Sequence, residues 1–64
     1  MDLSRYVGKN VILKERIPAD KRGYWIEKGV TLIVTKIYGQ FMNLKYQDGK
    51  LAANQVHYTK VMTG

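Results

Sequence analysis

Residues 29–49 constrain the fold of this 64-residue chain more than any other stretch. They hold two apolar runs of strand length, separated by Gly39-Gln40 and followed by Asp48-Gly49. Asp-Gly accepts the positive φ angles of a tight hairpin turn, and a two-residue alternation of apolar side chains is typical of a half-buried strand. Val30, Leu32 and Val34 carry this alternation in the first run, and Met42, Leu44 and Tyr46 carry it in the second. The stretch therefore predicts strands over 30–38 and 41–46.

Ile37 is out of phase with the alternation that precedes it. A β-bulge near Thr35 and Lys36 would return Ile37 to the core side and would bend the strand sharply. Small barrels need such bends to close. The alternative is a strand buried on both faces, with Ile33 also covered.

The segment before this pair of strands predicts one further strand and a long loop. Between residues 10 and 17, Val11, Leu13 and Ile17 alternate on one face, and Ile12, Lys14 and Arg16 occupy the other. Pro18 cannot donate to a β-ladder and is expected to end the strand. Residues 18–28 then form a charged loop that is longer than a hairpin needs, and loops of this length often carry binding residues.

The first residues of the chain predict one helical turn over 2–7, with Asp2 or Ser4 as its N-cap. We expect its apolar side chains, Leu3, Tyr6 and Val7, to plug an open end of the core. An extended lead-in is the alternative.

The last residues predict short elements. We expect a strand over 51–53, a 3₁₀ turn over 54–57 and a final strand over 58–62. A helix over 51–58 is the alternative, because Leu51, Gln55 and Tyr58 would share one helical face.

This order of elements resembles that of the SH3-like small β-barrels. The residues that carry the resemblance are Gly8-Lys9-Asn10-Val11-Ile12-Leu13, Gly29-Val30-Thr31-Leu32-Ile33-Val34, Asn43-Leu44-Lys45-Tyr46-Gln47-Asp48-Gly49-Lys50 and Asn54-Gln55-Val56. It implies an all-β protein, with residues 1–64 forming a single domain: a five-stranded, strongly bent antiparallel barrel. The superfamily includes modules that bind RNA, chromatin or peptides, and small phage and plasmid proteins, so the resemblance concerns the fold more than the function.

Enzymatic activity is not expected. His57 is the only histidine and there is no cysteine, so neither a metal site nor a catalytic pair can be assembled from these residue types. One group of SH3-like barrels, the small plasmid-encoded dihydrofolate reductases, uses a Val-Gln-Ile-Tyr stretch. The nearest stretch here, Gln55-Val56-His57-Tyr58, has an extra residue that would place Gln55 and Tyr58 on opposite strand faces. We therefore predict no cofactor and no small-molecule substrate.

Composition indicates where the protein works and what it contacts. The chain has no apolar leader, and its longest aliphatic run, 32–34, is too short to span a membrane. Together with the lack of cysteine this predicts a cytoplasmic protein without membrane contact. The net charge is +6, which favours a polyanionic partner, although it could also serve only to keep a small barrel soluble.

The predicted interior leaves several aromatic residues over. Leu13, Leu32, Val34, Ile37, Leu44, Tyr46 and Val56 are enough to fill the core, which leaves Tyr24, Trp25, Tyr38, Phe41 and Tyr58 for the surface or for lids over the core. Trp25 could serve either purpose. Exposed rings beside Lys and Arg form the platform that single-stranded nucleic acid uses, since bases stack on rings and phosphates meet cations.

We accordingly expect a non-enzymatic binding module whose favoured partner is nucleic acid. The candidate binding residues are Lys14, Arg16, Lys21, Arg22, Tyr24, Trp25, Lys36, Phe41 and Lys45. The alternative is a protein-interaction module that binds an acidic protein surface, such as a small inhibitor or accessory subunit of the kind that phages and mobile elements encode. A homodimer is a further expectation, in which Ile33 and Phe41 would bury each other across the interface.

Overall fold

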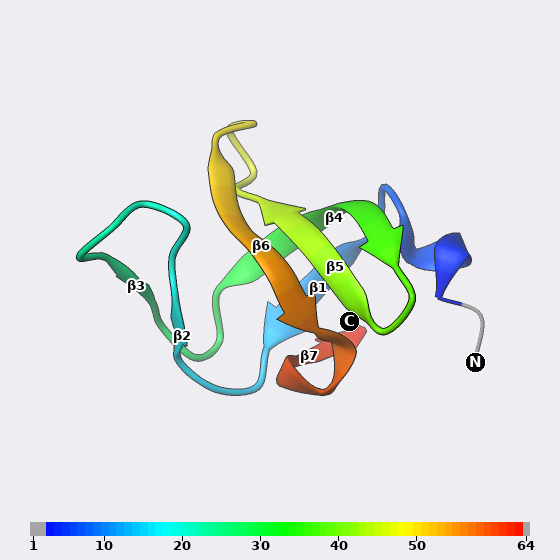
Figure 1. Cartoon of the computed structure of the whole chain (residues 1–64), viewed down its shortest axis with the longest axis horizontal. Helices are drawn as coiled ribbons and strands as arrows, with labels where there is room; N and C mark the ends of the chain where they lie inside the picture. Colours follow the sequence, from blue (N-terminus) through cyan, green and yellow to red (C-terminus); the bar gives the residue numbers. More distant parts are fainter. Residues whose placement is uncertain (1–2, 64) are drawn as a thin grey trace.

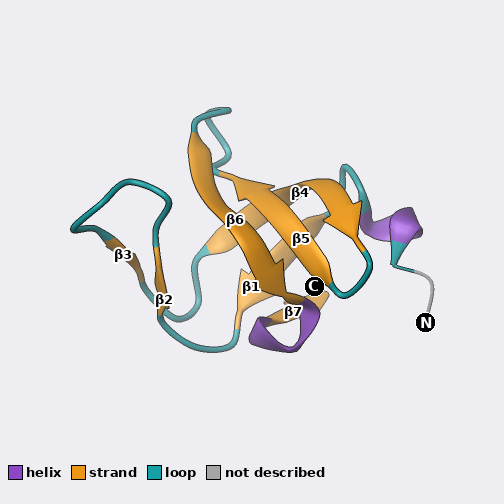
Figure 2. Cartoon of the chain, viewed as in Figure 1, coloured by secondary structure: helices purple, strands orange, loops and turns teal. Residues whose placement is uncertain are grey.

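The protein is described by a computed structural model that covers residues 3–63, and strands dominate it (Figures 1 and 2). A five-stranded antiparallel sheet has the order β6-β5-β4-β1-β7, and β2 and β3 form a separate two-stranded sheet. The only helical pieces in this part of the chain are two 3₁₀ turns, η1 and η2. In chain order the elements are η1 (Ser4–Tyr6), β1 (Asn10–Leu13), β2 (Ile17–Pro18), β3 (Trp25–Ile26), β4 (Thr31–Tyr38), β5 (Phe41–Lys45), β6 (Leu51–His57), η2 (Tyr58–Lys60) and β7 (Val61–Thr63).

The all-β prediction is confirmed, but the sheet is not a closed barrel. Strands β6 and β7 are the two edges of the five-stranded sheet, and within residues 3–63 they do not pair with each other. They follow one another in the sequence, joined by η2, which carries the chain from one edge of the sheet to the other (Figure 1).

The prediction of one strand over 10–17 is wrong, because β1 ends at Leu13 and the chain bends at Lys14 and Glu15. Up to this bend β1 is bonded on both sides: the Leu13 N–H donates to the Val30 carbonyl at 3.1 Å, just before β4, and the Lys14 N–H donates to the Lys60 carbonyl at 2.8 Å, which continues the pairing with β7. Ile17 then pairs with Ile26 in the β2–β3 hairpin, most of which falls in the predicted loop. Pro18 does end a strand, but that strand is the short β2, in which Pro18 lies opposite Trp25. A proline is tolerated there because a two-stranded sheet has free edges.

The bulge predicted in the second strand is confirmed. Val34 pairs with Leu44 and Lys36 pairs with Asn43, so Thr35 is the additional residue in β4. Ile37 consequently packs against the core, although it stays half-buried. The hairpin turn that follows β5 is also as expected, with Gly49 at a φ of +90° and the Asp48 carboxylate accepting from the Lys50 N–H at 2.9 Å.

The C-terminal predictions are corrected in their boundaries. Residues 51–57 form the single strand β6, neither a short strand followed by a 3₁₀ turn nor the alternative helix. The 3₁₀ turn comes later, at Tyr58–Lys60, where the His57 ring accepts from the Thr59 N–H at 3.3 Å, and the last strand begins only at Val61. The third strand ends at Lys45, one residue earlier than predicted.

Two bulges explain why β6 did not have the alternation of a regular strand. Leu44 pairs with Ala53 and Lys45 with Leu51, so Ala52 is an additional residue, and both alanines are buried. Met42 pairs with Val56, which leaves Asn54 and Gln55 together opposite Asn43. Each bulge shifts the phase of the side chains by one residue.

The core lies on the concave side of the sheet and beneath the β2–β3 hairpin. Its buried side chains are Leu3, Val11, Leu13, Ile17, Ile26, Leu32, Val34, Met42, Leu44, Ala52, Ala53, Val56 and Val61. Of the seven predicted core residues, Ile37 and Tyr46 are only partly buried. At the N-terminus Leu3 is buried and Tyr6 is partly buried, as expected, but Val7 is exposed. The predicted cap Asp2 lies outside the described residues.

Candidate functional site

The β2–β3 hairpin presents two exposed aromatic rings, each with a cation placed over it. The Arg16 guanidinium carbon lies 4.5 Å from the centroid of the Trp25 ring, and the Lys21 ammonium lies 4.8 Å from that of Tyr24. Both distances are within the range of cation–π attraction. Trp25 is 53% exposed and Tyr24 is 58% exposed, so Trp25 is a surface residue and not a lid over the core. We name Arg16, Lys21, Arg22, Tyr24 and Trp25 the hairpin surface.

The hairpin is attached to the main sheet through Asp20. Its N–H donates to the Ala52 carbonyl at 2.8 Å, and its carboxylate accepts from the Asn54 side-chain amide at 3.3 Å. Both partners belong to β6, and Ala52 is one of its bulge residues. Ile17 and Ile26, buried beneath the hairpin, add an apolar contact with the core. These contacts hold the hairpin surface next to the edge strand β6.

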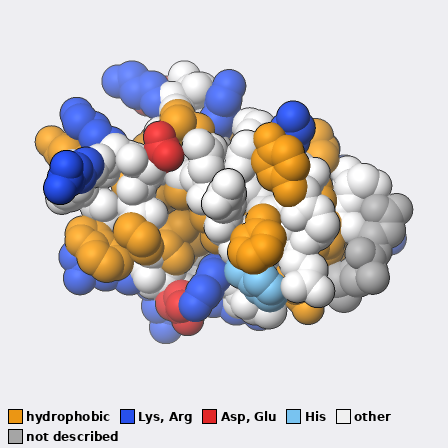
Figure 3. All heavy atoms as spheres, in the orientation of Figure 1, with side chains coloured by type: hydrophobic (Ala, Val, Ile, Leu, Met, Phe, Trp, Pro, Cys, Tyr) orange, Lys and Arg blue, Asp and Glu red, His pale blue; other side chains and the backbone are white. Residues whose placement is uncertain are grey.

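A second group of aromatic side chains lies on the outer face of β4, β5 and β6. Tyr38 is 47% exposed and Phe41 is 44% exposed, and the two residues pair in register at the end of the β4–β5 hairpin. The Lys36 ammonium lies 4.9 Å from the Tyr38 ring centroid. The His57 ring meets Phe41 edge to face, with centroids 5.3 Å apart. Figure 3 shows apolar side chains gathered at two separate places on one side of the molecule, over the hairpin and over β4 and β5.

Asn43 connects the two bulges that flank β5. The Thr35 hydroxyl donates to the Asn43 carbonyl at 3.2 Å, and the Gln55 N–H donates to the Asn43 side-chain Oδ1 at 3.1 Å. Gln55 has a φ of +55°, the only positive φ at a non-glycine residue in the described chain. Left-handed backbone costs an ordinary residue about 1–2 kcal/mol, so the Asn43 side chain supports a strained strand.

These residues line a hollow on the outer face, with a volume of about 550 Å³. Its lining residues are Tyr38, Phe41, Asn43, Asn54 and Gln55. We name it the amide hollow, since three of the five side chains are amides. The size falls within the range of about 300–1,000 Å³ that is typical of small-ligand pockets.

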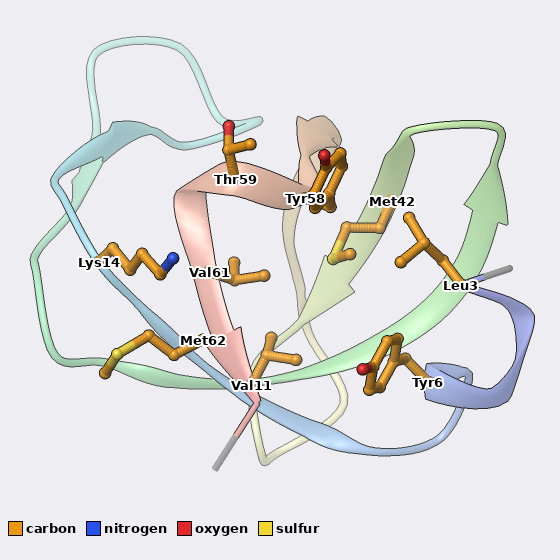
Figure 4. Close-up of a pocket in the computed structure, with 9 residues that line it drawn as sticks. All are labelled: Leu3, Tyr6, Val11, Lys14, Met42, Tyr58, Thr59, Val61 and Met62. Carbon is orange, nitrogen blue, oxygen red and sulfur yellow. The ribbon is translucent and has the colours of Figure 1, made fainter. Parts of the chain in front are cut away.

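A further pocket, of about 410 Å³, is mainly apolar and lies at the end of the core (Figure 4). Tyr6 and Tyr58 stand on opposite sides of it, with Leu3 and Met42 along one wall and Val11 and Val61 along the other. Lys14, Thr59 and Met62 complete the lining. The predicted plug by the N-terminal turn is therefore partial: Leu3 is buried at this end of the core, and a pocket remains beside it.

Most of the positive charge is not neutralised by neighbouring acids. Of the eleven Lys and Arg side chains, only Arg16 and Lys60 form ion pairs within residues 3–63, with Glu27 and Glu15 respectively. The others are free to attract an anion. In the same part of the chain, no group of three or more His, Cys, Asp or Glu residues is placed to hold a metal ion. None of its helical segments is long and apolar enough to cross a membrane.

The nine predicted site residues fall into separate groups. Arg16, Lys21, Arg22, Tyr24 and Trp25 all lie on or beside the β2–β3 hairpin, where they include the pairs Arg16–Trp25 and Lys21–Tyr24. Lys36 and Phe41 lie on the outer face at the amide hollow. Lys14 does not share a surface with Arg16, contrary to expectation: it lines the apolar pocket, because the strand breaks between the two residues. Lys45 lies at the far end of β5, opposite Ile33 and Leu51.

Tyr38, Asn43, Asn54 and Gln55 are absent from the predicted set. Tyr38 had a usable signal, since Lys36 and Tyr38 are two residues apart in a strand and share a face. No comparable sequence pattern marks Asn43, Asn54 and Gln55, because the two bulges bring them together.

The homodimer stays a prediction, and its two predicted contact residues do not form one continuous patch. Ile33 and Phe41 both lie on the outer side of the sheet, but Ile33 pairs with Lys45 and Phe41 with Tyr38, at opposite ends of β5. Four residues of strand separate them by about 13 Å.

No known protein family, curated protein or solved structure matches this chain. The function is therefore inferred from the surface itself.

Proposed function

We propose that this protein is a non-enzymatic module of SH3-like architecture that binds single-stranded nucleic acid. The observation that carries the proposal is the repeated pairing of a half-exposed ring with a cation. Trp25, Tyr24 and Tyr38 each have an Arg or Lys less than 5 Å from the ring centroid. Single strands offer the complementary sequence of groups, in which flat bases alternate with anionic phosphates.

The strand order supports the architectural part of the proposal. A sheet of order β6-β5-β4-β1-β7, with a hairpin inserted between β1 and β4 and a 3₁₀ turn before the last strand, has the connectivity of SH3-like barrels. In this chain the two edge strands stay apart, and Leu3 and Tyr6 add their side chains to the core.

The charge distribution supports a polyanionic partner. Lys21 and Arg22 lie at the exposed turn of the hairpin and form no ion pair within the described residues. Contacts of these two cations and Arg16 with three phosphates would give a slope of about −2 for log K against log salt concentration on a single strand.

The test is a titration of the protein with single-stranded and double-stranded oligonucleotides at about 50 and 200 mM salt, a range over which phosphate contacts weaken strongly. We expect tighter binding to the single strand and a loss of affinity at the higher salt concentration. Absence of binding at low salt, or binding without a salt slope, would refute the proposal. Equal affinity for single-stranded and double-stranded oligonucleotides would contradict a role of the rings in stacking, because bases in a duplex are not free to stack on them.

A second candidate function, protein interaction, is favoured by the apolar pocket between Tyr6 and Tyr58. Met62, exposed at its rim, would lose water contact if an apolar side chain of a partner entered the pocket. A pull-down after nuclease treatment separates the two functions: one stoichiometric protein that survives the treatment favours this candidate, and loss of all captured material favours nucleic-acid binding.

A further inference from the structure

The amide hollow combines a stacking surface with hydrogen-bonding groups. Phe41 and Tyr38 provide the rings, and Asn43, Asn54 and Gln55 provide the amides. Lys36 lies over Tyr38, whereas Phe41 has no cation over its ring within residues 3–63. Phe41 is therefore the ring that a neutral flat group can use, and Lys36 is placed to meet an anion attached to that group.

The amides of Asn43 and Gln55 have unused hydrogen-bonding capacity. The Gln55 N–H must meet an acceptor, so the contact identifies the anchored atom of Asn43 as Oδ1, and among the described residues its Nδ2 has no acceptor. The Gln55 side chain makes no hydrogen bond within the described residues and offers both a donor and an acceptor. Asn and Gln side chains recognise base edges because an amide can donate and accept in one plane. An unpaired base displays such edges in single-stranded nucleic acid.

The backbone conformation of Gln55 is strained. At a φ of +55° a glycine would have a lower conformational energy, yet the chain has an amide side chain at this position. Strain of this kind is often found where a residue has a functional role. The second bulge thereby sets Gln55 beside Asn43 at the hollow.

We propose that the amide hollow receives one unpaired nucleobase, stacked on Phe41 and hydrogen-bonded by Asn43 and Gln55, and that it gives the protein a preference among bases. This inference rests on the proposed function: the hairpin surface supplies affinity for any single strand, and the hollow selects which base is bound. Lys36 contacts the adjoining phosphate. Asn54, whose Nδ2 is bonded to Asp20, links the hollow to the hairpin.

The inference is tested with four homopolymeric single-stranded oligonucleotides and the variant Gln55→Gly. We expect the original protein to prefer one base by about fivefold or more, the size of one good amide–base contact. Gln55→Gly should reduce this preference to less than about twofold, although the variant unfolds at the same or a higher urea concentration because its backbone is relaxed. Phe41→Ala should weaken binding to all four oligonucleotides by roughly 5- to 100-fold, the usual effect of removing one stacked base.

Gln47→Ala is the matched control, since Gln47 is an exposed amide in the turn after β5 whose side chain bonds, within residues 3–63, to Asn10 alone. It should leave both the preference and the affinity unchanged. A structural role of Gln55 would give the opposite pattern, with lower stability and an unchanged preference.

The failure of this inference can be distinguished from the failure of the proposed function. Suppose that binding depends on salt but is equal for all four oligonucleotides and is unchanged by Gln55→Gly. The amide hollow is then not a base site, whereas the proposed role of the hairpin surface stands. If no oligonucleotide binds, titration with the four nucleoside monophosphates, followed through the side-chain amide NMR signals of Asn43 and Gln55, decides the matter. Absence of shifts in these signals overturns the inference. Shifts that saturate for one base support a mononucleotide site without a polynucleotide surface.

Discussion

The β2–β3 hairpin and the outer face of β4, β5 and β6 present similar rings and cations but hold them in different ways. The hairpin has two strands of two residues each and is attached to the main sheet by the two hydrogen bonds of Asp20 and by a small apolar contact. The outer face belongs to the five-stranded sheet and lies over the most deeply buried side chains. A lightly attached hairpin can adapt to many ligands, whereas a fixed face can select one.

The difference extends to the polar groups that surround the rings. On the hairpin they are long cations, which attract any phosphate and carry little geometric information. On the outer face one cation, Lys36, is joined by three amides, whose positions are set by bulges on both sides of Asn43. The hairpin surface is thus suited to general affinity and the outer face to selection among ligands.

The largest effect is expected in the core beneath the outer face. Leu44 is fully buried and lies between Val34 and Ala53 of the neighbouring strands. Leu44→Ala should lower the free energy of unfolding by about 2–5 kcal/mol, measured by urea denaturation. Ile26→Ala, beneath the hairpin, should cost less than Leu44→Ala because the two-stranded sheet can open locally. Equal losses would show that the hairpin is as firmly built into the fold as the main sheet.

Removal of a hairpin ring should affect binding and leave stability nearly unchanged. Trp25→Ala is expected to weaken single-strand binding by about 1–3 kcal/mol, the usual contribution of one stacked base, while the free energy of unfolding changes by less than about 1 kcal/mol. Fluorescence anisotropy of a labelled oligonucleotide measures the first quantity and urea denaturation the second. Leu51→Ala is the control, since Leu51 is an exposed apolar residue that belongs neither to the hairpin surface nor to the lining of the amide hollow. A stability loss without an affinity loss would assign Trp25 a packing role.

The sequence predicts the parts of the fold in which the side-chain period is regular or broken once. Leu32 and Val34 establish the buried face of β4, and the phase of Ile37 locates its single bulge. The Asp48-Gly49 turn follows from the conformational needs of a tight hairpin. These signals are local, so they do not depend on knowledge of neighbouring strands.

The remaining elements could not be obtained from the sequence because their signals depend on partners distant in the chain. The first strand pairs with β7 up to the Lys14 N–H, which donates to the Lys60 carbonyl 46 residues later, and the chain then bends at Lys14 and Glu15. Ala52 and Ala53 are both buried only because a bulge in β6 turns both inwards, and a consecutive pair of alanines does not distinguish a bulge from a helix. The amide hollow depends on two bulges in register across β5, and no period in one strand reveals such a coincidence.

A smaller effect is expected when the link between the two bulges is removed. Asn43→Ala deprives the Gln55 N–H of its acceptor and should lower the free energy of unfolding by about 1 kcal/mol. Asn43→Asp is the informative companion, because it keeps an acceptor oxygen for Gln55 but loses the free Nδ2 donor. Its stability should stay within about 0.5 kcal/mol of the original, a typical surface effect, while the preference among homopolymers falls. If Asn43→Ala is as stable as the original protein, the bulges are held by the strands alone.

The smallest effect concerns the ion pair that competes for the hairpin arginine. The Arg16 Nε lies 3.3 Å from the Glu27 carboxylate, and both side chains are more than half exposed. An exposed pair of this kind contributes about 0–1 kcal/mol, so Glu27→Gln should hardly change the free energy of unfolding. It should nevertheless tighten single-strand binding at low salt by a few-fold, because Arg16 is then available to a phosphate. Glu15→Gln is the matched control: it removes the same charge from another exposed pair, whose cation, Lys60, is not part of the hairpin surface. An equal gain in both variants would show that net charge alone governs binding, whereas a larger gain in Glu27→Gln would place the phosphate beside Arg16 and Trp25.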